Sequence, residues 1–176
     1  MVFDYPAKGG ARRVKAIADD DTAAILRALK RRRGGRDRLL AYRLGRRWHE
    51  LGADELNEYL KHHLGGGFSA KDFRTWNATV LAALALAGAD TNGASRRSRE
   101  QAIRGSVREV AHYLGNTPTV CRTAYIDPRV FDRFRAGTTI AGALNGTAPD
   151  PFEADRQTRQ RIEASVVAML GDGSGA

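Results

Sequence analysis

Arginine is the residue type in this chain best suited to bind another molecule, and many arginines lie close together. The chain of 176 residues contains 24 arginines and carries a formal net charge of +9. Ten basic residues stand against one acid, Asp37, within residues 27–47. A planar guanidinium can hold two phosphate oxygens at once, so this surplus favours nucleic-acid phosphate as the partner. A generic solvated basic surface is the alternative explanation.

Other motifs that could bind nucleotides or metals lack required residues. A glycine-rich stretch is similar to a phosphate-binding P-loop, but Ala70 stands in place of a glycine and Asp72 in place of the magnesium-binding Ser or Thr. His62 and His63 are adjacent and would point to different sides of a helix, which disfavours a metal site. The single cysteine, Cys121, is interpreted as a small buried residue. We expect neither a metal nor a small-molecule cofactor.

Three further segments are informative because they occur together in a fixed order. They are FDYPAKGG at residues 3–10, KDFRTW at residues 71–76 and LGNTPTVCRTAYIDP at residues 114–128. The second resembles the KDxRT box of type IB DNA topoisomerases of the poxvirus-like and bacterial kind, and the third resembles their LG[NH]TP…YIDP segment. The first is similar to their hairpin, in which a lysine stands beside glycines. The spacings also fit the family, so the resemblance covers residues 2–128.

The resemblance implies an enzyme that cleaves one strand of duplex DNA through a 3′-phosphotyrosyl intermediate and relaxes supercoils without ATP or metal. It implies that Tyr125 is the nucleophile and that Lys8 is the general acid that protonates the departing 5′ oxygen. Arg74 would stabilise the charge of the phosphorane. Asn116 would donate a hydrogen bond to a non-bridging oxygen, at a position where many relatives carry histidine.

These residue types suit the reaction. A covalent enzyme–phosphate ester keeps the energy of the broken phosphodiester. A tyrosine side chain has a reference pKa of about 10, so ionising it at pH 7 costs about 4 kcal/mol before neighbouring guanidiniums lower that cost. A single tyrosine is more often a core residue and a single arginine more often a surface cation, so the functional interpretation rests on their joint order. Further contacts to DNA are expected from four residues: Lys71, Arg46, Arg47 and Arg122.

Two other functions remain open at this point. The catalytic domain of a tyrosine recombinase or integrase is similar in fold and nucleophile, but its second arginine box usually begins with histidine where this chain has Lys71. A DNA-binding module without catalysis would need only the basic run of residues 27–47. Relaxation of supercoiled plasmid without metal or ATP would separate an enzyme from such a module.

The resemblance also implies residues that this sequence does not contain. The family uses a further catalytic arginine upstream of the lysine hairpin, together with a small amino-terminal clamp domain, and neither has a counterpart here. We therefore expect a catalytic fragment that is weakly active or inactive by itself, whether it is an excised piece or a truncated natural chain.

The elements that must position these residues are mostly helices. Strand pairs are expected within residues 1–18 and 38–48. Apolar spacing and cap residues predict helices over residues 19–33, 53–64, 69–90, 95–114, 118–124, 129–135 and 151–170. The helix that begins at Ser69 is expected to be the most buried, with an apolar stripe formed by Phe73, Trp76, Val80, Leu81 and Leu84. Residues 137–149 are rich in Gly, Thr and Ala and are expected to form a loop.

Together these elements predict an α+β fold, predominantly α-helical, of the DNA breaking-rejoining class, with a small amino-terminal β region. We expect a catalytic domain over residues 1–136, a linker over 137–150 and a carboxyl-terminal helix and tail over 151–176. The apolar content of 42% supports a core, and no apolar stretch approaches the length of a membrane span. We expect a soluble monomer bound to double-stranded DNA, cytoplasmic and nucleoid-associated, in a bacterium with GC-rich coding.

Overall fold

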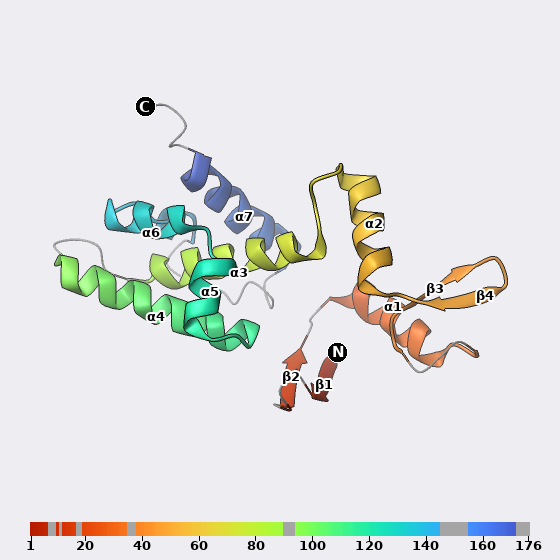
Figure 1. The fold of residues 1–176 in the computed structure, drawn as a ribbon. Helices are drawn as coiled ribbons and strands as arrows, with labels where there is room; N and C mark the ends of the chain where they lie inside the picture. Colours follow the sequence, from red (N-terminus) through yellow and green to blue (C-terminus); the bar gives the residue numbers. More distant parts are fainter. Residues whose placement is uncertain are drawn as a thin grey trace. The chain divides into compact units, whose positions relative to one another are not determined.

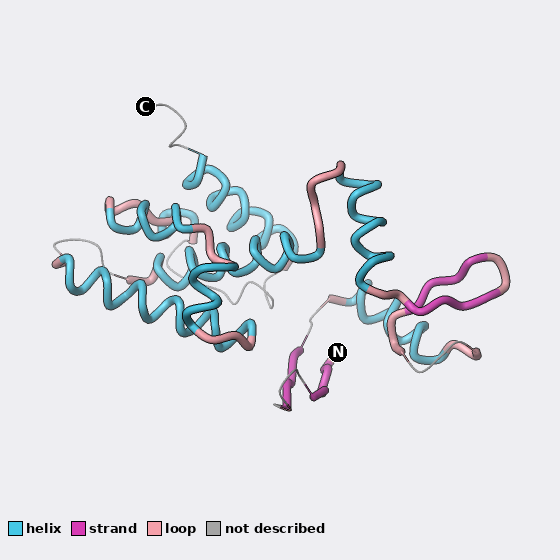
Figure 2. Tube along the Cα trace, in the orientation of Figure 1, coloured by secondary structure: helices cyan, strands magenta, loops and turns pink. Residues whose placement is uncertain are grey.

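The structure, a computed structural model, describes residues 1–6, 10, 12–16, 19–34, 38–89, 94–144 and 155–171. The chain divides into two compact units, Met1–Ser69 and Ala70–Ala176, and each is described by itself. The first unit contains two β-hairpins and two helices, and the regular elements described in the second unit are all helices, as the helix and strand colours of Figure 2 show. This mostly helical architecture with small hairpins confirms the predicted α+β class.

Both predicted hairpins are present in the first unit. Strand β1 (Val2–Pro6) pairs antiparallel with β2 (Arg12–Ala16), and β3 (Ala41–Leu44) pairs antiparallel with β4 (Arg47–Glu50). The turn between β3 and β4 begins at Gly45, whose φ of 59° is in the left-handed region that two-residue hairpin turns require. The tip of the first hairpin, where Lys8 is expected, lies outside the described residues.

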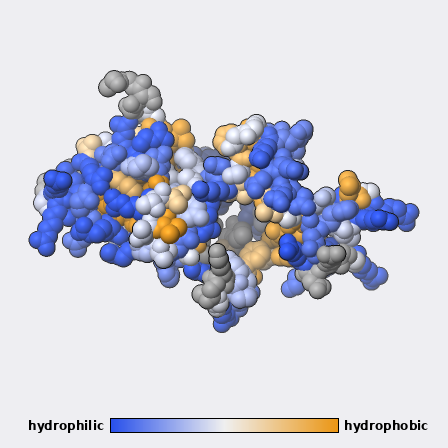
Figure 3. All heavy atoms as spheres, in the orientation of Figure 1, coloured by the Kyte–Doolittle hydropathy of each residue, from blue (hydrophilic) through white to orange (hydrophobic). Residues whose placement is uncertain are grey.

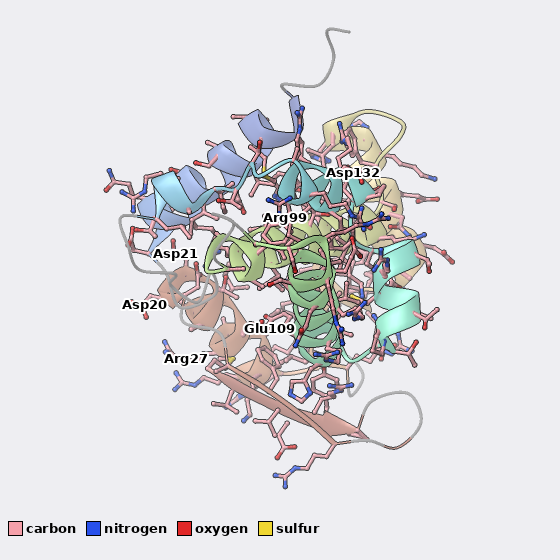
Figure 4. All side chains as sticks on the ribbon, turned by 90° about the vertical axis from the view of Figure 1, so that its left-hand side faces the viewer. Asp20, Asp21, Arg27, Arg99, Glu109 and Asp132 are labelled. Atoms are coloured by element: carbon pink, nitrogen blue, oxygen red, sulfur yellow. The ribbon has the colours of Figure 1, made fainter. Side chains whose placement is uncertain are left out.

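The two helices of the first unit begin at predicted cap residues. Helix α1 (Asp20–Arg31) starts after Asp19, whose Oδ1 accepts a hydrogen bond from the backbone N of Thr22 at 2.7 Å. Acids lie in its first turn and basic residues in its last, as the helix dipole favours; Figure 4 labels Asp20 and Asp21. Helix α2 (Ala53–Leu64) follows Gly52 and ends at Gly65. Among the described residues of this unit, the buried apolar side chains are Ala23 and Leu26.

The second unit is organised around α3 (Ala70–Ala87), which packs against α4 (Arg96–Leu114), α6 (Pro128–Arg135) and α7 (Arg156–Gly171), as Figure 1 shows. The short helix α5 (Pro118–Ala124) packs against α4. Most buried side chains of α3 are small or β-branched, which lets its neighbours approach closely: Ala78, Thr79, Val80, Ala82, Ala83, Leu84 and Leu86.

The predicted apolar stripe of α3 is correct except at its first member. Val80 and Leu84 are buried, and Trp76 and Leu81 pack against the core. Phe73, however, is 50% exposed. It lies in the first turn of α3, and the buried part of the helix begins only at Ala78. Helical spacing places Phe73 on the apolar face but says nothing about where along the helix the neighbouring helices begin to cover it.

The last helix confirms its predicted apolar face but not its predicted start. Ile162, Val166 and Leu170 are buried in the core. Helix α7 begins at Arg156. The side chain of the preceding residue, Asp155, accepts a hydrogen bond from the backbone N of Thr158 at 3.0 Å. The predicted start at Pro151 lies outside the described residues.

Part of the segment expected as a loop packs into the core. Residues 137–144 include a single 3₁₀ turn, η1 (Ala141–Ala143), between the buried side chains of Ile140 and Leu144. The turn contacts α7. In the part of the chain that the structure describes, no helix combines the length and the apolar character needed to cross a membrane.

Candidate active site

The guanidinium of Arg74 and the ring of Tyr125 lie together in the second unit. Arg74 is in the first half of α3, and Tyr125 is the residue at which α5 ends. The Cζ atom of Arg74 lies 5.0 Å from the centroid of the Tyr125 ring, within the range of a cation–π contact. Nη2 of Arg74 donates a hydrogen bond to the carbonyl oxygen of Leu114 at 2.7 Å. These two contacts hold the guanidinium beside the tyrosine.

The chain upstream of Tyr125 is held by local hydrogen bonds. Thr117 caps α5 by accepting a hydrogen bond from the backbone N of Val120 at 3.3 Å, and Pro118 occupies the first helical turn. The carbonyl oxygen of Cys121 accepts hydrogen bonds from the backbone N of Tyr125 at 3.1 Å and of Ile126 at 3.2 Å. Tyr125 is half-buried, whereas the side chain of Ile126 is buried in the core.

Downstream of Tyr125, the chain is attached to α3. The backbone N of Asp127 donates a hydrogen bond to Oγ1 of Thr79 at 3.1 Å. Thr79 itself is buried and donates to the carbonyl oxygen of Thr75 at 2.8 Å. Sequence reasoning did not single out Thr79. A threonine four residues after a helical carbonyl is a common local arrangement, and only the fold shows that its oxygen accepts a bond from Asp127.

The Asp127 carboxylate begins α6 and pairs with Arg129. Its Oδ1 accepts a hydrogen bond from the backbone N of Arg129 at 2.9 Å, and its Oδ2 lies 2.7 Å from Nη2 of Arg129. The hydrogen bond from the Arg129 side chain lowers the pKa of Asp127 below its ordinary value, although partial burial opposes this shift. Arg129 also donates to the carbonyl oxygen of Leu170 at 3.4 Å, which connects this segment to α7.

Two buried donor atoms near this site have no partner among the described residues. They are Nε of Arg74 and Nδ2 of Asn116. Asn116 follows the left-handed Gly115, whose φ is 71°, and its backbone N donates to the carbonyl oxygen of Ala111 at 2.9 Å. A buried donor without an acceptor costs about 1–3 kcal/mol, and an anionic ligand would supply acceptors. The Arg74 side chain donates a hydrogen bond to the carbonyl oxygen of Leu114, which comes two residues before Asn116 in the chain. The two donors therefore belong to side chains that are connected through this short stretch.

Cys121 is bonded to the Tyr125 segment through its backbone, and its side chain belongs to the core. Its side chain is fully buried, which confirms the interpretation as a small core residue. Burial raises the pKa of the Cys121 thiol, and the charge of Arg74 opposes that shift only in part. The thiol is therefore neutral at pH 7, and the contribution of Cys121 to the site is its backbone carbonyl.

The other predicted site residues belong to different elements of the two units. Lys71 is exposed in the first turn of α3, and Arg122 on α5 places its Cζ 5.1 Å from the ring centroid of Phe131. Arg46 and Arg47 are exposed at the β3–β4 turn of the first unit. On the face shown in Figure 3, hydrophilic residues cover much of the surface. Lys8 lies outside the described residues.

One member of the basic run has a structural role instead. Nη1 of Arg32 donates to the carbonyl oxygens of Leu29 at 2.8 Å and Leu39 at 2.9 Å. The guanidinium also lies over the ring of Trp48, with Cζ 5.8 Å from the centroid. Arg32 therefore connects the end of α1 to the second hairpin. Not every basic side chain of residues 27–47 is directed toward binding phosphate.

Comparison with known proteins gives one family. The family model described as "Eukaryotic DNA topoisomerase I, catalytic core" matches residues 1–146 of this chain. No curated protein matches the chain.

Proposed function

Because this chain belongs to the family of the eukaryotic DNA topoisomerase I catalytic core, we propose that Tyr125 is the nucleophile of its reaction. The chain is a topoisomerase I catalytic core, an isomerase that cleaves and rejoins DNA through a phosphotyrosine and relaxes supercoils. This confirms the function and the fold class implied by the three sequence segments. The observation that supports Tyr125 most directly is the Arg74 guanidinium 5.0 Å from its ring.

The proposed step exchanges one ester for another. The Oη of Tyr125 forms a bond to phosphorus and gives up its proton to solvent water, and the bond from phosphorus to the 5′ oxygen breaks. The departing 5′ oxygen takes a proton from Lys8, the proposed general acid. The product is a 3′-phosphotyrosyl ester, and attack by the 5′ hydroxyl reverses every bond change. No ATP is consumed because the ester keeps the energy of the phosphodiester.

Arg74 and Asn116 are the proposed stabilisers of the phosphorane. Their unpartnered buried donors, Nε and Nδ2, support this role because the extra negative charge on phosphate oxygens would satisfy them. Asn116 can donate a hydrogen bond but cannot carry a positive charge, so its contribution is expected to be smaller than that of Arg74.

Contacts to duplex DNA are proposed for four basic residues, and their exposure or charge supports the proposal: Lys71, Arg46, Arg47 and Arg122. We also propose the poxvirus-like and bacterial subtype, for which the KDFRT and YIDP segments are the support. A monomeric protein acting on nucleoid DNA in the bacterial cytoplasm is the corresponding physiological proposal. The catalytic domain is proposed to cover residues 1–136, followed by the segment 137–150 and the carboxyl-terminal helix and tail, 151–176.

The nucleophile can be identified chemically. The protein is incubated with supercoiled plasmid in a chelator without ATP, the adduct is trapped with denaturant, and the protein–DNA complex is digested with nuclease and trypsin. Cleavage after Arg122 and Arg129 releases residues 123–129, in which Tyr125 is the sole tyrosine. We expect the nucleotide on this peptide and a 5′ hydroxyl on the nicked strand. A nucleotide on another tyrosine peptide would contradict the assignment.

A further inference from the structure

Thr79 is the one buried hydroxyl that directly joins the segment of Tyr125 to the helix of Arg74 in the described part of the second unit. We propose that Thr79 is a positioning residue, which holds Tyr125 in the correct place relative to Arg74 for attack on phosphorus. The inference rests on the proposed role of Tyr125 and concerns how that nucleophile is aligned.

The hydroxyl of Thr79 both donates and accepts a hydrogen bond. It donates to the carbonyl oxygen of Thr75 at 2.8 Å and accepts from the backbone N of Asp127 at 3.1 Å. Thr75 directly follows Arg74 in α3, and Asp127 comes two residues after Tyr125. The two hydrogen bonds therefore connect the backbone beside Arg74 to the backbone beside Tyr125. The residue is only 2% exposed, so water cannot readily replace the hydroxyl.

The backbone hydrogen bond of Tyr125 itself leads to a different helix. Its backbone N is bonded to Cys121 within α5, and α5 packs against α4. The proposed phosphate-stabilising arginine is carried by α3. Without the Thr79 bond, the distance between nucleophile and guanidinium would depend on the cation–π contact and on how α4 and α6 pack against α3. The hydroxyl adds a direct hydrogen-bonded connection to these packing contacts.

Removal of this hydroxyl is expected to slow chemistry without weakening DNA binding. In Thr79→Val the shape is kept, but the N–H of Asp127 loses its acceptor and the segment must shift to find another. Misplacement of a reacting group by 1 Å can cost about 10²-fold in rate. Thr79 is buried and cannot itself contact DNA, so the affinity for DNA is expected to stay at the wild-type value.

The test compares Thr79→Val with Thr79→Ser, which keeps the hydroxyl and loses the methyl group. The readouts are the rate of adduct formation on plasmid DNA at saturating protein, the equilibrium affinity for duplex DNA, and the melting temperature. We expect Thr79→Val to form adduct about 10²-fold more slowly at unchanged affinity and Thr79→Ser to restore the rate. Equal rates for the two variants, or a loss of affinity that accounts for the slower rate, would overturn the proposal.

Two further variants keep the result interpretable. If Thr79→Val does not fold, Thr79→Ala against Thr79→Ser asks the same question, because the two side chains differ only in the hydroxyl group. Tyr125→Phe is measured beside them. If Tyr125→Phe forms adduct, the assignment of Tyr125 as nucleophile is wrong. If Tyr125→Phe forms no adduct but Thr79→Val or Thr79→Ala reacts at the wild-type rate, only the role proposed for Thr79 is wrong.

Discussion

The guanidinium of Arg74 lies over the aromatic ring of Tyr125, with its Cζ atom 5.0 Å from the ring centroid. Two elements far apart in the sequence supply these groups, and a hydrogen bond from Arg74 to the carbonyl of Leu114 keeps the cation in place. A positive charge at this position would stabilise the negative charge of a phosphate bonded to the phenol oxygen, which is the role proposed for Arg74. The following predictions test whether the chemistry uses this arrangement.

Replacement of Tyr125 by phenylalanine is expected to abolish covalent attachment to DNA, because the substitution removes only the oxygen that would bond to phosphorus. The fold and the noncovalent affinity should remain, since the ring and its contact with Arg74 are kept. The measurement is the yield of denaturant-resistant protein–DNA adduct. Tyr59→Phe, an exposed tyrosine of α2 in the other unit, is the matched control and should form adduct normally. Recovery of adduct from Tyr125→Phe would identify another nucleophile.

Arg74→Lys is expected to keep a positive charge but to slow adduct formation on the order of 10²-fold, because lysine cannot present the planar fork of a guanidinium to phosphate. The rate is measured under single-turnover conditions at pH 7. Arg108→Lys, which changes an exposed arginine on α4 in the same way, should react at the wild-type rate. A wild-type rate in Arg74→Lys would show that a point charge at this position is sufficient.

Changing Arg46 and Arg47 together to glutamine is expected to make DNA binding less dependent on salt. Each phosphate contact releases counterions, so the loss of two contacts should reduce the slope of log affinity against log salt by roughly two. The control removes two exposed arginines of α4 instead, Arg96 and Arg97. An unchanged slope in the Arg46 and Arg47 variant, or an equal change in the control, would mean that these side chains make no particular contact.

Asp127→Asn is expected to destabilise the protein by about 1 kcal/mol near pH 7, since the amide can still cap α6 but no longer pairs as a charge with Arg129. The pKa of Asp127 is lower in the folded protein than its ordinary value of 3.8. Its charge therefore stabilises the fold fully above about pH 4, and this stabilisation is lost as the pH falls through the lowered folded value.

The measurement is the free energy of unfolding of both proteins from pH 7 downward. The difference between wild type and Asp127→Asn should shrink in the acid range. Arg129→Gln should show the same trend. The double variant should lose less free energy of unfolding than the sum of the losses of the two single variants. A difference that stays constant down to pH 2 would show that the charge of Asp127 contributes nothing to stability.

Where the helices begin and end was predictable from the sequence because caps act over only a few residues. Asp19 caps α1, Thr117 and Pro118 begin α5, and Gly115 ends α4 in the left-handed conformation. Each of these signals requires only its own neighbours in the chain. The two hairpins were predictable for the same reason, and the three diagnostic segments lie within the range that the family model matches.

The contacts that form the site depend on the tertiary structure. Helical spacing assigned Phe73 to the apolar face of α3, yet the covering helices leave it half exposed. The composition of residues 27–47 suggested binding to phosphate throughout, yet Arg32 uses its guanidinium to hold a hairpin. The contact of Arg74 with Tyr125 and the bond of Thr79 to Asp127 join residues that are far apart in the chain. Local sequence patterns encode which face of a helix is apolar and where the helix ends, whereas the distance between two functional groups depends on how whole helices pack, because side-chain volumes along the entire interface determine it.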